Sequence, residues 1–359
     1  MAKVLMKGNE AIGEAALRAG CRFFFGYPIT PQSEVPEYLS KRMPEVGGTF
    51  VQAESEVAAS NMIYGASGVG VRVLTTSSSP GISLMTEALS YIACCELPVV
   101  LVNIVRSGPG LGGILPAQSD YFQATKGGGH GDYRLIVMAP ASVQEAVDLV
   151  IEAFDMADNY RNPVMILGDG MIGQMMEPVD FGDHPLPQPG FHEEPDKPWA
   201  LTGTGSRPDG TRNIVNSLYL DPDECNAINL KLQAKYAEVT ANEQRWQDFH
   251  TDEEVDLLVV SYGTMSRICR TTMAKLRAEG KKISLIRPIS LYPFPYDAVR
   301  AAGDRAKKVI SIEMSMGQMV EDVRLAMEGT KPVHFFGTAG GLVPTPEQVR
   351  DAMLNLIDE

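Results

Sequence analysis

Residues 99–105 constrain the fold of this chain more than any other segment. Every residue in it except Asn103 is apolar, so apolar side chains occupy consecutive positions rather than alternate ones. A strand with that pattern is covered on both faces, which is typical of a parallel sheet packed between helices. We therefore expect an α/β fold with this segment as one of its buried strands.

Strand-like and helix-like patterns alternate around this segment, from residue 22 to about residue 170. Helix 142–158 opens with a capping box formed by Ser142 and Glu145. The alternation predicts a parallel sheet with helices on both sides. We expect its strands at residues 22–25, 49–52, 71–75, 98–105, 135–137 and 164–167, and helices at residues 56–66, 82–95 and 142–158.

We expect a second α/β unit after the first. A chain of 359 residues is long enough to form two domains. Residues 182–212 are dense in Pro and Gly and predict a long ordered crossover, and a polar helical segment follows at about residues 222–249. Strands at 255–261, 283–286 and 308–312 and a helix at 265–279 then resume the pattern. We expect domains at residues 1–180 and 253–359, joined by a crossover and helix at 181–252.

Charge and cysteine content exclude several classes of protein. With 31 Lys and Arg against 45 Asp and Glu, the net charge of −14 disfavours a nucleic-acid partner. The five cysteines form no Cys-x-x-Cys pair and no cluster with His, so we expect no metal or iron–sulfur site in this chain. Scattered cysteines, no signal-peptide core and no apolar stretch of about 20 residues predict a cytoplasmic protein without a membrane span.

Polar residues follow three of the predicted strands. Thr30 stands in a loop held by two prolines, Glu54 and Glu56 precede a helix, and Arg106 opens a Gly-rich loop at residues 107–113. Carboxyl ends of parallel strands meet at one edge of a sheet. We therefore expect a hydroxyl, a carboxylate and a guanidinium to share one crevice.

Each of these side chains also has an ordinary structural interpretation. Glu56 suits the first turn of a helix, where a carboxylate is favoured by the helix dipole. Thr30 suits the N-cap of the following helix. Arg106 suits an ion pair with Asp120 or Glu87. The residues alone leave both interpretations open.

The amino-acid sequences of four segments resemble the alpha subunit of the 2-oxoacid:ferredoxin oxidoreductases, which are thiamine diphosphate enzymes. The segments are residues 7–11, 26–32, 52–59 and 127–134, and their sequences are most similar to the branched-chain (3-methyl-2-oxobutanoate, or 2-ketoisovalerate) type. The resemblance implies a pyrimidine-type thiamine diphosphate-binding domain followed by a smaller transketolase C-terminal-like α/β domain.

The resemblance also implies roles for individual residues. Glu56 is the catalytic carboxylate that hydrogen-bonds N1′ of the aminopyrimidine. Thr30 and Arg106 bind the 2-oxoacid. Pro28 and Ile29 pack against the cofactor. The resemblance therefore favours Glu56 as the catalytic carboxylate. Glu54, two residues earlier, is the alternative carboxylate, and its role stays open.

Three further candidates surround these residues. Tyr27 lies beside Pro28 in the first loop. Ser79 belongs to a Ser-rich turn at residues 77–81 that suits a phosphate cradle or, equally, a capped helix start. His130 lies in a Gly-rich loop, where a proton-shuttle role competes with a structural one.

Partner chains are implied as well. The sequence Gly168-Asp169-Gly170 is typical of the start of a thiamine diphosphate and magnesium motif, but no Asn pair follows about 25 residues later. We therefore expect a beta subunit to hold Mg²⁺ and the diphosphate of a shared thiamine diphosphate. A gamma subunit and a ferredoxin-like delta subunit with iron–sulfur clusters are also implied. Coenzyme A and ferredoxin would be the remaining reactants, in an oxidative decarboxylation that forms an acyl-CoA.

Other functions remain open. Selection of 2-oxoglutarate requires a second cation, for which Lys126 and Arg134 are available. A non-redox thiamine decarboxylase or transferase would release carbon dioxide without an electron acceptor. A non-catalytic nucleotide-binding α/β regulatory protein is disfavoured because no Gly-x-Gly-x-x-Gly opens the first βα unit.

Overall fold

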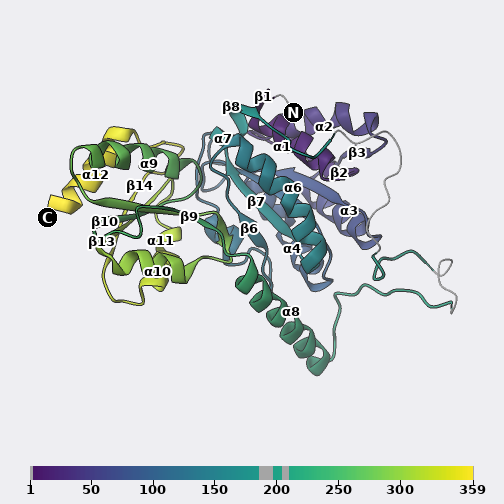
Figure 1. The fold of residues 1–359 in the computed structure, drawn as a ribbon. Coiled ribbons are helices and arrows are strands. Elements are labelled where there is room, and N and C mark those ends of the chain that lie inside the picture. The colour runs from purple at the N-terminus through teal and green to yellow at the C-terminus, as the bar shows by residue number, and fades with distance from the viewer. Residues whose placement is uncertain (1–2, 186–196, 204–209, 359) are drawn as a thin grey trace.

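The chain folds into two α/β units that lie side by side (Figure 1). The computed structural model describes residues 3–185, 197–203 and 210–358. The first unit contains the N-terminal half of the chain, and the second begins near residue 246. Helix α8 (Pro222–Asn242) lies between them in sequence and projects below both units in the view of Figure 1.

The first unit is built on a seven-stranded sheet, as the consecutive apolar pattern predicts. Its strand order is β12-β6-β7-β5-β4-β2-β3, and every pair is parallel except β12 with β6. All six residues of β5 are buried. The strands are β2 (Phe23–Gly26), β3 (Thr49–Gln52), β4 (Val73–Ser77), β5 (Val100–Val105), β6 (Ile136–Met138), β7 (Val164–Asp169) and β12 (Ser290–Tyr292).

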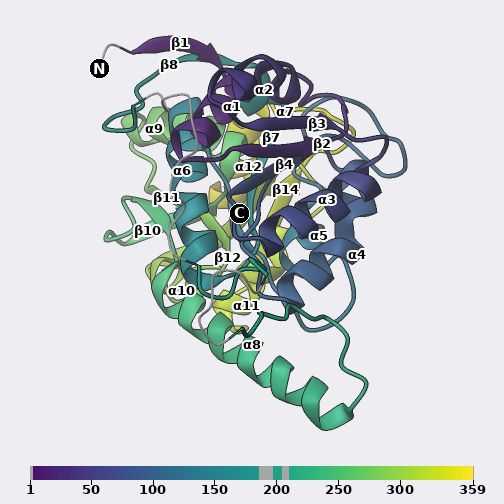
Figure 2. The ribbon, with the colours of Figure 1, turned by 90° about the vertical axis from the view of Figure 1, so that its right-hand side faces the viewer.

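Helices cover both faces of this sheet because side chains of β5 point alternately to each face. Val100, Val102 and Ile104 pack against α1 (Gly8–Arg18), α2 (Glu34–Glu45) and α6 (Val143–Tyr160). Leu101 and Val105 pack against the opposite layer, α3 (Glu56–Gly68) and α4 (Pro80–Cys94). Figure 2 shows α6 on one side of the sheet and α3 and α4 on the other.

The predicted start of α6 is confirmed, although Glu145 accepts the amide before the N-cap residue instead of the amide of Ser142 itself. The Ser142 hydroxyl accepts the Glu145 amide at 3.1 Å, and the Glu145 carboxylate accepts the Ala141 amide at 2.6 Å. Short elements complete the unit: α5 (Tyr121–Thr125), α7 (Gly170–Gln174), and an antiparallel pair of β1 (Val4–Lys7) with β8 (Met176–Val179).

The second unit is a five-stranded sheet of order β14-β13-β10-β11-β9. One face packs on α9 (Gly263–Ala278) and α12 (Pro346–Asp358), and the other on α10 (Tyr296–Asp304) and α11 (Met319–Met327). The second face shares one apolar core with α3 and α4, so the two units are packed together. The strands are β9 (Trp246–Phe249), β10 (Val255–Val260), β11 (Ile283–Pro288), β13 (Ala306–Glu313) and β14 (Val333–Gly337).

The sequence patterns did not predict strands β1, β8, β9, β12 and β14, and two of these change the predicted arrangement. The polar helix ends at Asn242, and residues 246–249 form β9, which pairs antiparallel with β11. Strand β12 leaves the second unit and pairs with β6 in the first sheet. Strands β9 and β12 are short and pair with strands that are distant in sequence, so no local sequence pattern predicts them. Of the predicted crossover at residues 182–212, residues 186–196 and 204–209 lie outside the described residues.

No helix in the described part of the chain is long and apolar enough to cross a membrane.

Candidate functional site

Four neighbouring strands deliver the candidate residues to one edge of the first sheet. In the order β5-β4-β2-β3, the segments that follow the strands contain Arg106, Ser79, Thr30 and Glu56. Because the strands are parallel, their carboxyl ends open on the same side. The expectation that the hydroxyl, carboxylate and guanidinium gather at one edge rests on this topology.

Glu56 is a buried carboxylate at the start of α3. The Ser55 hydroxyl caps this helix by accepting the Ala58 amide at 3.1 Å. Glu56 is 6% exposed, whereas Glu54 is exposed to solvent. Among the described residues we find no hydrogen bond or ion pair to Glu56. Buried polar groups are normally paired within the protein, so this one is available to a bound molecule.

The close approach of α4 to Glu56 requires a glycine. A Cβ on Gly81 would lie 2.1 Å from Ser77 Oγ and 2.7 Å from Glu56 Oε1. The first turn of α4 therefore covers the carboxylate, and any side chain at residue 81 would displace it. Sequence reasoning missed Gly81, although a glycine directly after Pro80 at a helix start was a visible signal.

Thr30 lies in the loop after β2, and it does not cap α2. The N-cap of that helix is Ser33, so the capping interpretation is wrong. The Thr30 carbonyl accepts a hydrogen bond from Arg106 Nη1 at 2.9 Å, which ties the loop after β2 to the end of β5. Tyr27, Pro28 and Thr30 are exposed, and Ile29 is half-buried.

Arg106 is buried and is held by backbone carbonyls. Its Nη2 donates to the Leu111 carbonyl at 3.1 Å, and its Nε is buried without a hydrogen-bond partner among the described residues. The predicted ion pair is likewise absent from the described part of the chain. Glu87 accepts the Tyr91 hydroxyl, and Asp120 accepts the Asn103 amide at 2.9 Å.

Ser79 directly precedes α4 and is bonded to the end of β5. Its amide donates to Asn103 Oδ1 at 3.0 Å, so this amide is not free to hold a phosphate. Its hydroxyl accepts the Arg106 amide at 3.0 Å. The sequence analysis missed Asn103, although it is the single polar residue in the apolar run.

His130 lies away from these residues. Its carbonyl accepts the Ser90 hydroxyl at 2.7 Å, and its ring contacts Tyr91 edge-on, with centroids 6.1 Å apart. Ser90 lies eleven residues beyond Ser79, which at 1.5 Å per residue is about 16 Å along α4. The structure therefore does not bring His130 together with Glu56 and Arg106.

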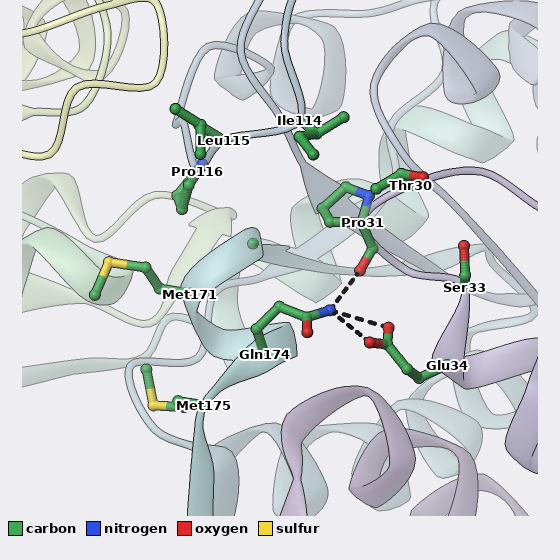
Figure 3. A pocket seen from close by; sticks show the side chains of 11 residues that line it. Thr30, Pro31, Ser33, Glu34, Ile114, Leu115, Pro116, Met171, Gln174 and Met175 are labelled. Carbon is green, nitrogen blue, oxygen red and sulfur yellow. Dashed lines mark hydrogen bonds between the residues drawn. The ribbon is translucent and has the colours of Figure 1, made fainter.

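Two cavities flank the Gly-rich loop after Arg106. One, of about 560 Å³, lies between the two units and is lined by Ser79, Arg106 and Asp120 from the first and Met314 and Gln318 from the second. The other, of about 690 Å³, borders Thr30 and is mostly apolar. Figure 3 shows side chains that line it, among them Thr30, Pro31, Ile114, Leu115, Pro116, Met171 and Met175, with Gln174 bonded to Pro31 and Glu34.

The two cations considered for a second carboxylate are engaged elsewhere. Lys126 forms an ion pair with Asp322, and the Arg134 guanidinium lies over the Tyr292 ring, 5.7 Å from its centroid. Both line a third, smaller cavity that contains neither Arg106 nor Thr30.

Asp169, from the motif that resembles a metal site, is used by the fold. Its carboxylate caps α7 by accepting the amides of Met171 at 2.9 Å and Ile172 at 3.2 Å. Burial raises the pKa of this carboxyl. Within the described ranges, no group of three or more His, Cys, Asp or Glu side chains is arranged to hold a metal ion.

Comparisons with known proteins agree with this architecture. Residues 14–248 match the family described as pyruvate flavodoxin/ferredoxin oxidoreductase, thiamine diphosphate-binding. Residues 255–349 match the pyruvate:ferredoxin oxidoreductase core domain II. A ketoisovalerate oxidoreductase subunit of Methanothermobacter thermautotrophicus is 48% identical, over 95% of this chain and 94% of that protein. The chain belongs to the 2-oxoacid:ferredoxin oxidoreductase family.

More distant relatives share the fold. A 2-oxoglutarate synthase subunit of M. thermautotrophicus is 35% identical over 98% of both chains. The solved 2-oxoglutarate:ferredoxin oxidoreductase of Magnetococcus marinus is 27% identical with a TM-score of 0.86. That match covers 99% of the chain described here but only 65% of the solved M. marinus chain. A split-gene transketolase, 14% identical with a TM-score of 0.59, shares the fold.

Proposed function

We propose that this chain is the alpha subunit of a thiamine diphosphate-dependent 2-oxoacid:ferredoxin oxidoreductase acting on branched-chain 2-oxoacids such as 3-methyl-2-oxobutanoate. The observation that carries the proposal is the buried carboxylate of Glu56, which has no partner among the described residues and lies at the same sheet edge as Arg106 and Thr30. The ketoisovalerate oxidoreductase relatives, at 48% and 47% identity, support the substrate class.

Glu56 fits the pyrimidine half of thiamine diphosphate. An unpaired, nearly buried carboxylate is the group needed to share a proton with N1′ of the aminopyrimidine. When bound, the cofactor supplies a nucleophilic carbon that adds to the keto group of the substrate. The contribution of Glu56 is to hold the proton at N1′, and the contribution of Gly81 is to let the first turn of α4 pass close to that carboxylate.

Arg106 and Thr30 would orient the 2-oxoacid. The guanidinium is fixed by two backbone carbonyls, which accept one N–H each from Nη1 and Nη2, so each of these nitrogens keeps a second N–H. A fixed guanidinium suits a planar carboxylate. Pro28 and Ile29, with Tyr27 beside them, would pack against the cofactor from the loop after β2.

A branched-chain substrate suits the surroundings better than 2-oxoglutarate does. Lys126 forms an ion pair with Asp322, and Arg134 lies over the Tyr292 ring, so both cations are engaged elsewhere. The cavity beside Thr30 is mostly apolar. An apolar side chain needs no second cation, whereas a distal carboxylate would be left without one.

Partner chains would complete the enzyme. We propose that a beta subunit holds Mg²⁺ and the diphosphate, and that gamma and ferredoxin-like delta subunits serve coenzyme A and the iron–sulfur clusters. The sequence has no set of cysteines at the spacings that an iron–sulfur cluster needs and no Asn pair after Gly168-Asp169-Gly170, which supports this division. A cytoplasmic location stays a prediction.

The test is a comparison of substrates in the complex purified with its partner chains. We expect 3-methyl-2-oxobutanoate to be oxidised with a higher kcat/KM than 2-oxoglutarate, and only when coenzyme A and an electron acceptor are present. A preference for 2-oxoglutarate would overturn the substrate class. Release of carbon dioxide without any electron acceptor would overturn the oxidoreductase assignment.

A further inference from the structure

We propose that Asn103 is a positioning residue that holds the turn at Ser79 and thereby sets the position of Arg106. This inference rests on the proposed role of Arg106 in binding the 2-oxoacid carboxylate. It is carried by hydrogen bonds that link the ends of β4 and β5 to Asp120.

Asn103 is fully buried in a strand whose other residues are apolar. Both ends of its amide are used at the sheet edge. Oδ1 accepts the Ser79 amide at 3.0 Å, and Nδ2 donates to Asp120 Oδ2 at 2.9 Å. The side chain therefore joins the turn that precedes α4 to the segment that precedes α5.

The turn at Ser79 needs such a restraint. Ser79 has φ of 29° and ψ of −84°, a region that residues with a Cβ rarely adopt. Backbone strain of this kind persists only where surrounding contacts over-determine it, and it gathers at functional sites. The bond from Asn103 to the Ser79 amide is one such contact.

Ser79 passes this restraint to Arg106. The Ser79 hydroxyl accepts the Arg106 amide at 3.0 Å and donates to the Arg106 carbonyl at 3.3 Å. Both backbone polar groups of Arg106 are thus fixed by one hydroxyl, while its guanidinium is fixed by carbonyls of Thr30 and Leu111. A shift of the turn at Ser79 would move the backbone of Arg106 and therefore its guanidinium group.

An ordinary structural role for Asn103 makes a different prediction. If Asn103 only satisfied polar groups of the core, its loss would lower stability without selectively weakening substrate binding. Asn162 provides the matched control. It is also fully buried and donates to the carbonyls of Arg134 and Pro163, beside the amino end of β7, at the opposite edge of the same sheet.

The experiment measures kcat, KM for 3-methyl-2-oxobutanoate and thermal stability of the assembled complex. We expect Asn103→Ala to raise KM by about ten- to a hundredfold with a smaller change in kcat, because misplaced binding groups cost that much. Asn162→Ala should lower stability and leave KM unchanged. Equal KM values for the two variants would overturn the inference.

Two Ser79 variants keep the test valid if Asn103→Ala fails to assemble. Ser79→Ala keeps the strain and loses the hydroxyl, whereas Ser79→Gly relieves the strain and also loses the hydroxyl. We expect both to raise KM, although Ser79→Gly is the more stable. A KM that returns to the wild-type value in Ser79→Gly would overturn the inference.

Arg106→Ala separates this inference from the proposed function. We expect a raised KM in Arg106→Ala and no further rise in the double variant Asn103→Ala/Arg106→Ala, since the two residues act through one group. An unchanged KM in Arg106→Ala would overturn the proposed role of Arg106. A raised KM in Arg106→Ala with full additivity in the double variant would overturn only the positioning role of Asn103.

Discussion

Two buried glutamates occupy similar places in the two units of this molecule and have opposite surroundings. Glu56 follows β3 and begins α3, while Glu313 ends β13 a few residues before α11. Glu313 is fully buried and accepts five hydrogen bonds, from the hydroxyls of Ser311 and Ser315 and the amides of residues 318, 319 and 320. Glu56 is nearly as buried, and no described residue donates to it.

The difference separates a structural carboxylate from a functional one. A buried charge without donors is costly, and proteins usually supply them, as the loop before α11 does for Glu313. At Glu56, Gly81 of α4 lies close to the carboxylate instead, and none of the described residues forms a hydrogen bond or ion pair with it. We infer that the missing donor belongs to the cofactor.

The largest expected effect is on catalysis at Glu56. Glu56→Ala should lower oxoacid-dependent dye reduction by the assembled complex by at least about 10²-fold, the usual contribution of a positioned acid or base. The melting temperature should not fall, because none of the described residues loses a hydrogen bond or ion pair. Full activity in this variant would refute the catalytic role.

The matching substitution in the second unit should act on stability instead. Glu313→Gln presents an amide group to donors that need an acceptor, and we expect a loss of about 2 to 3 kcal/mol in unfolding free energy. Denaturant unfolding of the complex measures it. Unchanged stability would contradict the structural role given to Glu313.

A smaller effect is expected at Gly81. Gly81→Ala would place a Cβ 2.1 Å from Ser77 Oγ and 2.7 Å from Glu56 Oε1, so both side chains must shift. We expect kcat to fall by about 10- to 100-fold, as for other misplacements of about 1 Å. Gly65→Ala, in α3, is the control, because a Cβ added at Gly65 would meet no described atom within 4 Å. Equal kcat values for the two variants would contradict the close approach.

The smallest effect concerns Lys126. Lys126→Met removes the ion pair with Asp322, which still accepts the hydroxyls of Tyr121 and Tyr296. We expect a stability loss of about 1 kcal/mol and an unchanged ratio of kcat/KM for branched-chain oxoacids and 2-oxoglutarate. A change in that ratio would assign Lys126 to the substrate site.

The sequence predicted those parts of the fold that depend on local pattern. The apolar run at residues 99–105 predicted the buried strand β5, and Ser142 with Glu145 predicted the start of α6. Strands β9 and β12 were not predicted, because a short strand is stabilised by a partner that only the folded chain supplies. The same limit applies to β1, β8 and β14.

The candidate site was predictable to a similar degree. Strand ends and the family resemblance located Glu56, Thr30 and Arg106 at one sheet edge. The contacts that constrain them, from Asn103 to Ser79 and from Gly81 to Glu56, link residues on different strands and helices. Sequence spacing carries no information about such contacts, so they required the structure.

The most direct test of the account is the exchange of the C2 proton of thiamine diphosphate for deuterium, measured by quenched-flow NMR on the assembled complex. The account predicts that Glu56→Gln slows this exchange by at least about 10²-fold at full cofactor occupancy, while Gly65→Ala leaves it unchanged. Exchange at the wild-type rate in Glu56→Gln, with the cofactor bound, would contradict the central claim that this carboxylate activates the cofactor.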